Sequence, residues 1–301
     1  MRIGLQLRAP LRNGVNVLDD LIDSARRAQQ AGLSSFWLAQ AYDFDAMIAL
    51  ALIGRAGVDI DLGTAVIPTY PRHPLVVAQQ ALTVQAACRD RFVLGLGPSH
   101  REVIETVYGM SFTGVARHVE HYVEAVLAAM DSPLAVRGGS SCPVVIGAMG
   151  PMMLRLAGAL AGGTVTSRAG VKTLGSYIVP RVNEAARHAG KPPPRIAACL
   201  AFCLTHDVDG AYERAVVEVG TSERYPSYQR MLAMEGVTRP VDVAIIGDEI
   251  TAERKIRALF DAGITEYLAR PFGTDDEQER SLQFLGSLNG AAPRHNASTG
   301  V

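Results

Sequence analysis

The sequence predicts an α/β protein and, within that class, a (β/α)8 barrel. Eight short apolar segments alternate with helical patterns along the 301 residues. A helix stopped by glycine and followed directly by a strand recurs: "AGLSSF" at 31–36 is echoed by "AGITEY" at 262–267 and, more loosely, by "AGGTVT" at 161–166. No Pro/Ser-rich linker divides the chain, so we expect one domain over 1–290 and a loose tail over 291–301. A doubly wound parallel sheet is the alternative.

The expected strands are apolar runs that follow a helix-ending glycine or lead into glycine or proline. In order, they are residues 3–7, 34–40, 60–67, 91–97, 143–148, 163–167, 195–205 and 264–271. The first helix is marked by apolar residues at helical spacing and is ended by Gly32. These apolar residues are Leu18, Leu21, Ile22, Ala25 and Ala28. Further helices are expected at about 44–56, 74–87, 100–108, 114–130 and 249–262, with a last one ending near 288.

Composition narrows the function classes. Hydrophobic residues make up 48% of the chain, charged residues 20%, and the formal net charge is −1. No basic run is present that would recruit nucleic acid or an anionic membrane surface. The first ten residues lack the features of a signal peptide, and no apolar run is long enough to cross a bilayer. The four cysteines show no CxxC or zinc-finger spacing, which predicts buried, reduced thiols in a cytoplasmic protein without a metal site.

The stretch "VLGLGPSH" at 93–100 could belong to either of two kinds of glycine-lined turn. A dinucleotide-binding turn needs a third glycine three positions after Gly97, and that position is His100. In a barrel, the same residues form the loop after the fourth strand, at the end where barrel active sites lie. Gly97 would then let a flat ligand approach the backbone. His100 could bind a cofactor carbonyl, act as acid or base, or simply face solvent near a helix start.

The exits of strands two and three carry further candidates. Gln40 follows the second strand, and its amide can bond a carbonyl or a ring N–H but cannot abstract a proton. Asp43 and Asp45 are either paired carboxylates or N-caps of the next helix, and capping is favoured. The segment "GTAVIPTYPRHP" at 63–74 is either a wall of small residues for a ring or an ordinary Pro-rich turn.

The exits of strands five and six suggest an anion site. "GAMGP" at 147–151 and "TSRAG" at 166–170 both precede helices, whose first N–H groups can face an anion. Arg168 and Lys172 add positive charge nearby. These residues together indicate a phosphate site.

The combination resembles the luciferase-like flavin and deazaflavin oxidoreductases, and more narrowly their coenzyme F420-dependent members. The likeness is carried by residues 60–100 and by "GAMGPMMLRLAGALAGGTVTSRAG" at 147–170, and it extends over nearly the whole chain. It implies a TIM barrel with an insertion, and a non-prolyl cis peptide at Ala65-Val66 behind the cofactor ring. It also implies hydride transfer between C5 of coenzyme F420 and a small organic substrate. The alternatives are an FMN-dependent monooxygenase of the same superfamily and a barrel that binds a ligand without turnover.

The resemblance also assigns site residues. The catalytic candidates are His100, as acid, base or orienting group, and Gln40, as a contact to the ring or the substrate. The cofactor-binding candidates are Gln40, Thr64, Ala65, Val66, Pro98, Ser99, His100, Gly147, Ala148, Met149, Gly150, Thr166, Ser167 and Arg168. Family members often dimerise, so a homodimer is compatible with the resemblance, although no heptad or apolar stripe marks an interface here.

The sequence departs from the family pattern in three ways. Sugar-phosphate dehydrogenases of the family carry Asp-His after strand two and Glu after strand four, where this chain has Gln40-Ala41 and His100. That substrate class is therefore disfavoured. Ser167-Arg168 stand where some members have an aromatic residue. Finally, "DSPLAVRGGSSCP" at 131–143 is short for the insertion between helix four and strand five, which predicts a reduced lid and a more open pocket.

Overall fold

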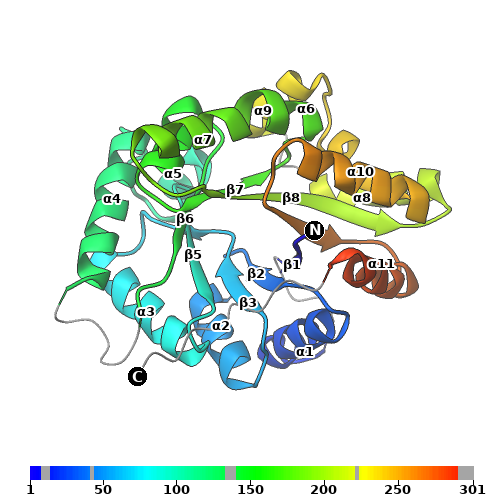
Figure 1. The fold of residues 1–301 in the computed structure, drawn as a ribbon, viewed down its shortest axis with the longest axis horizontal. Coiled ribbons are helices and arrows are strands. Elements are labelled where there is room, and N and C mark those ends of the chain that lie inside the picture. Colours follow the sequence, from blue (N-terminus) through cyan, green and yellow to red (C-terminus); the bar gives the residue numbers. More distant parts are fainter. Residues whose placement is uncertain (8–13, 41–43, 133–139, 221–223, 291–301) are drawn as a thin grey trace.

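Eight parallel strands close into a barrel in the computed structural model (Figure 1). The residues described are 1–7, 14–40, 44–132, 140–220 and 224–290, so the expected tail lies outside them. Around the barrel the strands are β1 (Ile3–Leu7), β2 (Ser35–Leu38), β3 (Asp61–Thr64), β5 (Phe92–Gly97), β6 (Val144–Gly147), β7 (Gly163–Ser167), β8 (Arg195–Leu204) and β10 (Glu266–Pro271). Pairing of β10 with both β8 and β1 closes the ring. These are the eight strands expected from the sequence, and the TIM barrel is confirmed.

Two short strands lie beside the eight. β4 (Ile67–Pro68) continues the third strand beyond a break at residues 65–66 and pairs with β5. The Ala65-Val66 peptide in this break is cis, at the position that the resemblance implies. β9 (Ile245–Gly247) pairs with the end of β8 and extends the sheet outside the barrel.

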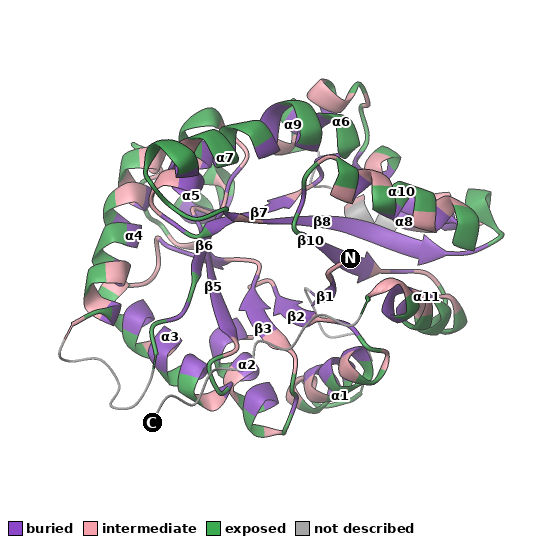
Figure 2. Ribbon diagram, in the orientation of Figure 1, coloured by how far each residue is buried: buried purple, intermediate pink, exposed green. Residues whose placement is uncertain are grey.

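Helices surround the barrel, with their inner faces buried and their outer faces exposed (Figure 2). The ring consists of α1 (Val17–Gln30), α2 (Ala46–Arg55), α3 (Pro74–Ala87), α4 (Val115–Met130), α5 (Pro151–Ala159), α7 (Val179–His188), α10 (Glu249–Asp261) and α11 (Asp275–Leu288). The helical segment expected at 100–108 is present over residues 101–107, and most of it is the π-helical turn η1 (Val103–Val107). Two short elements, α6 (Val171–Thr173) and η2 (Leu174–Ile178), lead into α7. No helix in the described ranges is both long and apolar enough to span a membrane.

The segment between β8 and β9 is longer than the sequence analysis anticipated. It holds α8 (Val208–Val219), α9 (Pro226–Glu235) and the 3₁₀ turn η4 (Pro240–Val243). The short connection at 131–143 falls mostly outside the described residues. The segment that reaches the strand exits is therefore the one after β8, the seventh barrel strand, and it contains α8 and α9.

Local signals explain how several helices start and stop. Gly32 and Gly263 both take left-handed backbone angles, with φ of 90° and 97°, directly after α1 and α10. Glycine adopts this conformation without steric cost, so the echo between the two segments is a repeated helix-to-strand junction. Asp45 caps α2: its Oδ1 accepts from Met47 N and Ile48 N at 2.9 and 3.1 Å, which confirms the capping hypothesis. Asp43 lies outside the described residues.

The core has two layers. A large apolar layer separates the barrel from the helices, and a smaller cluster fills the barrel itself. The inner cluster comprises Trp37, Val93, Val145, Val165, Ala197, Cys199 and Leu268. The Trp37 ring also takes the space beside Gly63, where a Cβ would stand 2.4 Å from it. Gly63 therefore serves barrel packing, and the small residues of the third strand do not leave open space at this point.

The four cysteines are buried and free, as predicted. Burial raises the pKa of the Cys88 and Cys142 thiols to about 12, so both stay protonated at neutral pH. They behave as small core residues rather than as nucleophiles.

Ion pairs close the N-terminal end of the barrel. The fully buried Glu266 carboxylate accepts from Ser35 Oγ at 2.5 Å and pairs with Arg195 NH2 at 2.6 Å and Arg2 Nε at 3.3 Å. The Arg195 guanidinium also lies 5.0 Å from the centre of the Trp37 ring. Since this end is neutralised within the chain, ligands are expected at the opposite, C-terminal end.

Replacing Glu266 with Ala should lower the free energy of unfolding by about 3 kcal/mol, the lower end for breaking a buried ion pair, because both arginines keep some contact with water. The control is Glu279→Ala, which removes an exposed ion pair with Arg27 and should cost at most about 1 kcal/mol. Urea denaturation of the three proteins measures both values. Equal losses for the two variants would contradict the structural role given to Glu266.

Candidate functional site

The break in the third strand forms the floor of the barrel mouth. Val66 projects toward β5 and β6, where a Cβ at Gly97 would stand 2.6 Å from Val66 Cγ2 and a Cβ at Gly147 would stand 3.3 Å from it. The glycine at 95 accommodates the carbonyl oxygen of Thr64, 1.8 Å from the position of a Cβ. Gly97 thus makes room for Val66, which corrects the expectation that it faces a flat ligand directly. A ring at this wall would lie on Val66 itself.

Thr64 is fully engaged within the barrel wall. Its hydroxyl donates to Gly95 O at 2.9 Å and accepts from Gly95 N at 2.7 Å. The side chain is completely buried. It holds the break in place and has no free group for a ligand, whereas Ala65 and Val66 are half-buried.

Gln40 ties the second strand exit to the same floor. Its backbone N–H donates to Val66 O at 3.4 Å, and its amide oxygen accepts from Ala46 N at 3.3 Å, at the start of α2. The amide oxygen therefore helps to hold α2, and its second lone pair and the amide NH2 could serve a ligand.

His100 is covered by an element that the sequence analysis did not assign to the site. Pro98, Ser99 and His100 are half-buried at the exit of β5, and Ser99 has a left-handed φ of 63°. The His100 ring stacks on Tyr225 with centroids 3.7 Å apart and planes 6° apart, and Tyr228 lies 5.3 Å away. Both tyrosines belong to the start of α9, which holds the imidazole in one orientation. The aromatic run "YPSY" at 225–228 is the signal that could have found them.

The β6 and β7 exits bring together the groups expected to bind a phosphate. Gly150 is the N-cap of α5 and supplies no side-chain hydrogen bond, and the space in its Cβ direction is open. Gly147, the last residue of β6, pairs with Val165, so Ala148 and Thr166 follow the last printed pair of the two strands. Thr166 Oγ1 is buried without a hydrogen-bond partner among the described residues. An uncapped helix start and an unsatisfied hydroxyl thus lie at the same edge of the barrel, which fits an anionic group.

The other expected anion position, at the start of α6, is already occupied by the chain itself. The Glu235 carboxylate from α9 accepts from Lys172 N at 3.1 Å and from Thr173 N at 2.8 Å. Arg168 is buried, donates to Ser167 Oγ at 3.1 Å and lies 5.0 Å from the centre of the Tyr228 ring. Arg168 and Ser167 are therefore next to the mouth, but the N–H groups after them are satisfied by Glu235.

An aromatic group lines the outer side of the β4 exit. Thr69 Oγ1 lies 2.9 Å from His118 Nε2, and the Tyr70 ring stacks on His118 with centroids 4.0 Å apart. Burial lowers the pKa of His118 and raises the pKa of Tyr70 and Tyr122, so all three side chains are neutral at neutral pH. The hydroxyls of Tyr70 and Tyr122 are buried without partners. This group could bind a polar ligand atom, and it was missed because His118 lies on a helix rather than at a strand exit.

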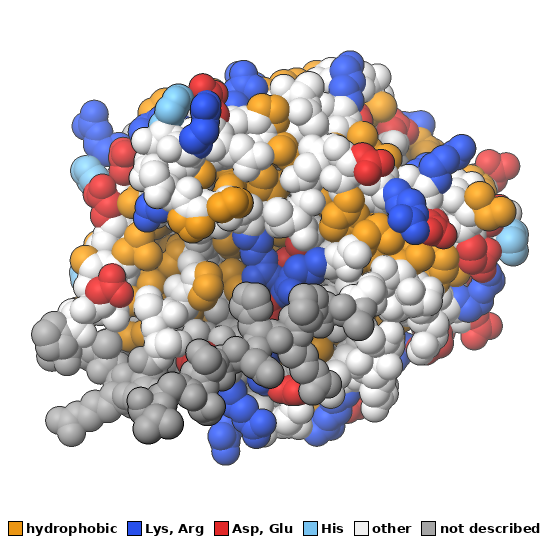
Figure 3. All heavy atoms as spheres, viewed as in Figure 1, with side chains coloured by type: hydrophobic (Ala, Val, Ile, Leu, Met, Phe, Trp, Pro, Cys, Tyr) orange, Lys and Arg blue, Asp and Glu red, His pale blue; other side chains and the backbone are white. Residues whose placement is uncertain are grey.

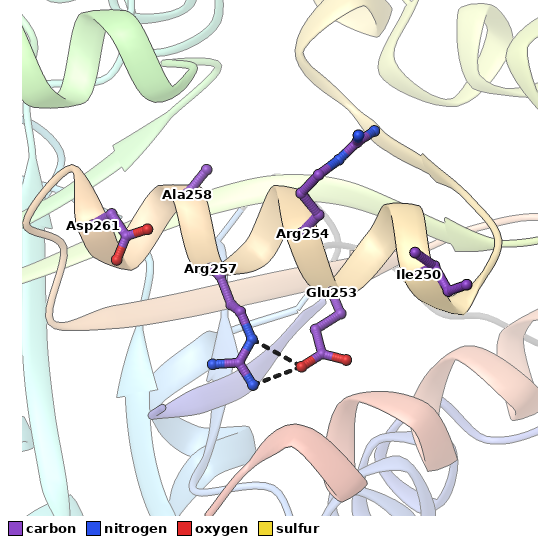
Figure 4. A pocket seen from close by; sticks show the side chains of 6 residues that line it. All are labelled: Ile250, Glu253, Arg254, Arg257, Ala258 and Asp261. Carbon is purple, nitrogen blue, oxygen red and sulfur yellow. Dashed lines mark hydrogen bonds and ion pairs between the residues drawn. The ribbon is translucent and has the colours of Figure 1, made fainter.

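A shallow, open patch on the outside of the barrel does not belong to this site. Its lining side chains all come from α10, where Glu253 and Arg257 pair with each other (Figure 4). On the face seen in Figure 3, acidic and basic side chains are interspersed around the rim without a dominant charge of one sign. Neither feature points to a binding partner.

Comparisons with known proteins identify the family and agree with the fold. The family model for luciferase-like monooxygenase matches residues 1–266. The 5,10-methylenetetrahydromethanopterin reductase of Methanopyrus kandleri is 23% identical, over 86% of this chain and 90% of its own length. An F420-dependent secondary alcohol dehydrogenase, solved with an F420–acetone adduct, superposes with a TM-score of 0.78 at 18% identity, covering 95% of this chain and 97% of that one. The FMN-bound oxygenating constituent of 3,6-diketocamphane monooxygenase from Pseudomonas putida superposes with a TM-score of 0.75 at 18% identity, covering 95% and 96%.

Two substitutions on β7 test whether Thr166 carries an unsatisfied hydroxyl. Thr166→Val should leave the free energy of unfolding unchanged or raise it by up to about 1 kcal/mol, because the removed hydroxyl has no partner. Thr164→Val should lower it by about 1 kcal/mol, because that hydroxyl donates to Ile146 O at 2.8 Å. Urea denaturation of the ligand-free proteins distinguishes them. A loss at Thr166 equal to that at Thr164 would show that the hydroxyl is satisfied internally.

Proposed function

The chain is an enzyme of the luciferase-like monooxygenase family, and on that premise we propose that it is a coenzyme F420-dependent oxidoreductase acting on a small organic substrate. The observation that carries the proposal is the match to a methylenetetrahydromethanopterin reductase along nearly the full length of both chains. The structural likeness to an F420-dependent alcohol dehydrogenase supports it. When bound, the deazaflavin supplies a hydride donor or acceptor at its C5 atom.

Features of the strand exits support this proposal for the ring and for a phosphate of the cofactor. Val66, seated on the glycines of β5 and β6, offers an apolar floor for the ring. Pro98 and Ser99 lie at the edge of that floor. The open start of α5 and the unsatisfied Thr166 hydroxyl suit a phosphate, since N–H and O–H donors at a helix N-terminus favour an anion.

His100 is assigned the role of general acid, general base or orienting group beside the ring. Its imidazole is held by the stack on Tyr225, so its nitrogen atoms keep fixed directions. A preset ring plane spares the cost of ordering the side chain when the substrate arrives. Gln40 is assigned a supporting contact through its amide NH2. The Asp-His pair typical of sugar-phosphate dehydrogenases has no counterpart at Gln40-Ala41, so we propose a substrate outside that class.

An FMN-dependent monooxygenase is the second candidate, and a specific observation favours it. The FMN complex of the diketocamphane enzyme superposes nearly as well as the F420-dependent alcohol dehydrogenase. The two cofactors share a tricyclic ring and a phosphate, so the floor at Val66 and the start of α5 would serve either.

Titration of the purified protein with coenzyme F420 and with FMN, followed by absorbance and fluorescence, separates the two candidates. We expect saturable binding of coenzyme F420 in the micromolar range or tighter. Thr166→Val should weaken that binding about tenfold, the effect of losing one hydrogen bond to a charged group. Micromolar FMN binding without any response to coenzyme F420 would overturn the first choice and support the monooxygenase.

His100→Ala tests the catalytic assignment. With a substrate found by screening small alcohols and carbonyl compounds for a change in deazaflavin absorbance, kcat should fall at least about 100-fold if the imidazole moves a proton. Tyr225→Phe keeps the ring stack and should leave kcat within a few-fold of the original. An unchanged kcat in His100→Ala would remove the catalytic role of His100 while leaving the fold and cofactor assignments intact.

A further inference from the structure

Arg270 places a buried cation inside the barrel mouth. Leu268 belongs to the cluster that fills the barrel, and side chains two apart on a strand share a face, so Arg270 also points inward. It lies near the C-terminal end of β10, two residues after Leu268. Only 9% of the residue is exposed. Its guanidinium therefore lies just below the opening of the mouth.

This guanidinium lacks a partner within the described part of the chain. No ion pair or hydrogen bond to Arg270 is found there, and its Nε is buried and unsatisfied. Its neighbour on β1, Gln6, makes its hydrogen bonds elsewhere: the amide NH2 donates to Leu7 O at 2.8 Å, and the amide oxygen accepts from Cys199 Sγ at 3.1 Å. Arg195, at the opposite end of the same barrel, is by contrast paired with Glu266. A buried charge without a counter-charge is strongly unfavourable, and its presence calls for an explanation.

A second cationic group lies close by. The thiol of Cys199 has its pKa raised by burial, and the charges of Arg270 and Arg168 both oppose that rise. Both guanidinium groups therefore act on the same point in the barrel.

β10 lies on the wall of the barrel opposite the floor formed at Val66. In the closed ring of eight strands, β10 and β5 are four strands apart in either direction, so they form opposite walls. Val66 is seated on the β5 and β6 wall. Arg270 thus faces the exposed side of any ring lying on Val66, which is the side on which a substrate would bind.

We propose that Arg270 binds a carboxylate or phosphate group of the substrate, so that the substrate is a small organic anion. This inference rests on the proposed function, and it adds the chemical class of the substrate. A guanidinium binds a carboxylate through two parallel N–H donors, which would satisfy the buried group and orient the substrate against the opposite wall. The partner that the described residues do not supply is then supplied by the ligand.

The first measurement follows the Arg270 side chain itself. In protein labelled with ¹⁵N-arginine, the Nε–H signal of Arg270 is identified by its loss in Arg270→Met. Sodium acetate and sodium phosphate should shift this signal in a saturable way, and sodium chloride at equal ionic strength should not. Arg270→Lys, which keeps the charge without the two-pronged geometry, should bind both anions at least tenfold more weakly by calorimetry. A signal unmoved by either anion overturns the proposal.

The second measurement is thermal unfolding of the ligand-free variants. Arg270→Met should have a Tm equal to or above that of the original protein, because it removes an unpaired buried charge. Arg195→Met, the matched control at the other end of the barrel, should have a Tm lowered by several degrees, because it leaves Glu266 buried without its principal partner. Loss of folding or of Tm in Arg270→Met would show that the guanidinium has an internal partner, which also overturns the proposal.

A third arm separates the substrate from the cofactor as the source of the anion. With coenzyme F420 bound, acetate should still shift the Arg270 signal, as expected if the anion belongs to the substrate. Displacement of acetate by coenzyme F420 would assign Arg270 to the cofactor and overturn the substrate class. If the protein binds neither coenzyme F420 nor FMN, the proposed function fails, yet a saturable acetate shift that requires Arg270 would still establish the anion site.

Discussion

The steric fit between the break in the third strand and the glycines opposite it determines the shape of the barrel mouth. A Cβ at residue 95 would overlap the carbonyl oxygen of Thr64, and a Cβ at residue 97 would overlap Val66. A larger side chain at either position would destabilise the protein, because close-packed interiors have few voids that could accommodate an added methyl group. The glycines of β5 therefore hold the floor of the mouth, and His100 takes its place at the end of the same strand.

The two ends of the barrel differ in how their buried charges are paired. At the N-terminal end, Glu266 and Arg195 satisfy each other, and Ser35 supplies a further donor. At the C-terminal end, Thr166 Oγ1 and Arg270 Nε are buried without hydrogen-bond partners in the described part of the chain, and Arg91 Nε, just before β5, is another such atom. Paired groups stabilise the structure, whereas an unsatisfied buried group lowers stability. The contrast between Arg195 and Arg270 supports the proposal that a ligand binds at the C-terminal end.

Helix α9 shapes the mouth from a distant part of the chain. At its start, Tyr225 stacks on His100, and at its end, Glu235 caps the start of α6. The carboxylate of Glu235 occupies the helix start that follows "TSRAG". The segment between β8 and β9 thus sets both the orientation of the imidazole and the contacts at the start of α6.

The sequence by itself determined the eight strands, their order and the loops that would meet at one end of the barrel. Alternating apolar runs and glycine-terminated helices are local signals, and parallel pairing then brings all the strand exits together. The capping by Asp45 and the burial of the cysteines were predictable for the same local reason. What Gly97 faces, what holds Gln40 and what covers His100 were decided only in the tertiary structure. Each depends on a side chain from a segment far along the chain. The same holds for Arg270, for which the described residues supply no partner. No pattern along one strand records which distant atoms will fill the space beside it.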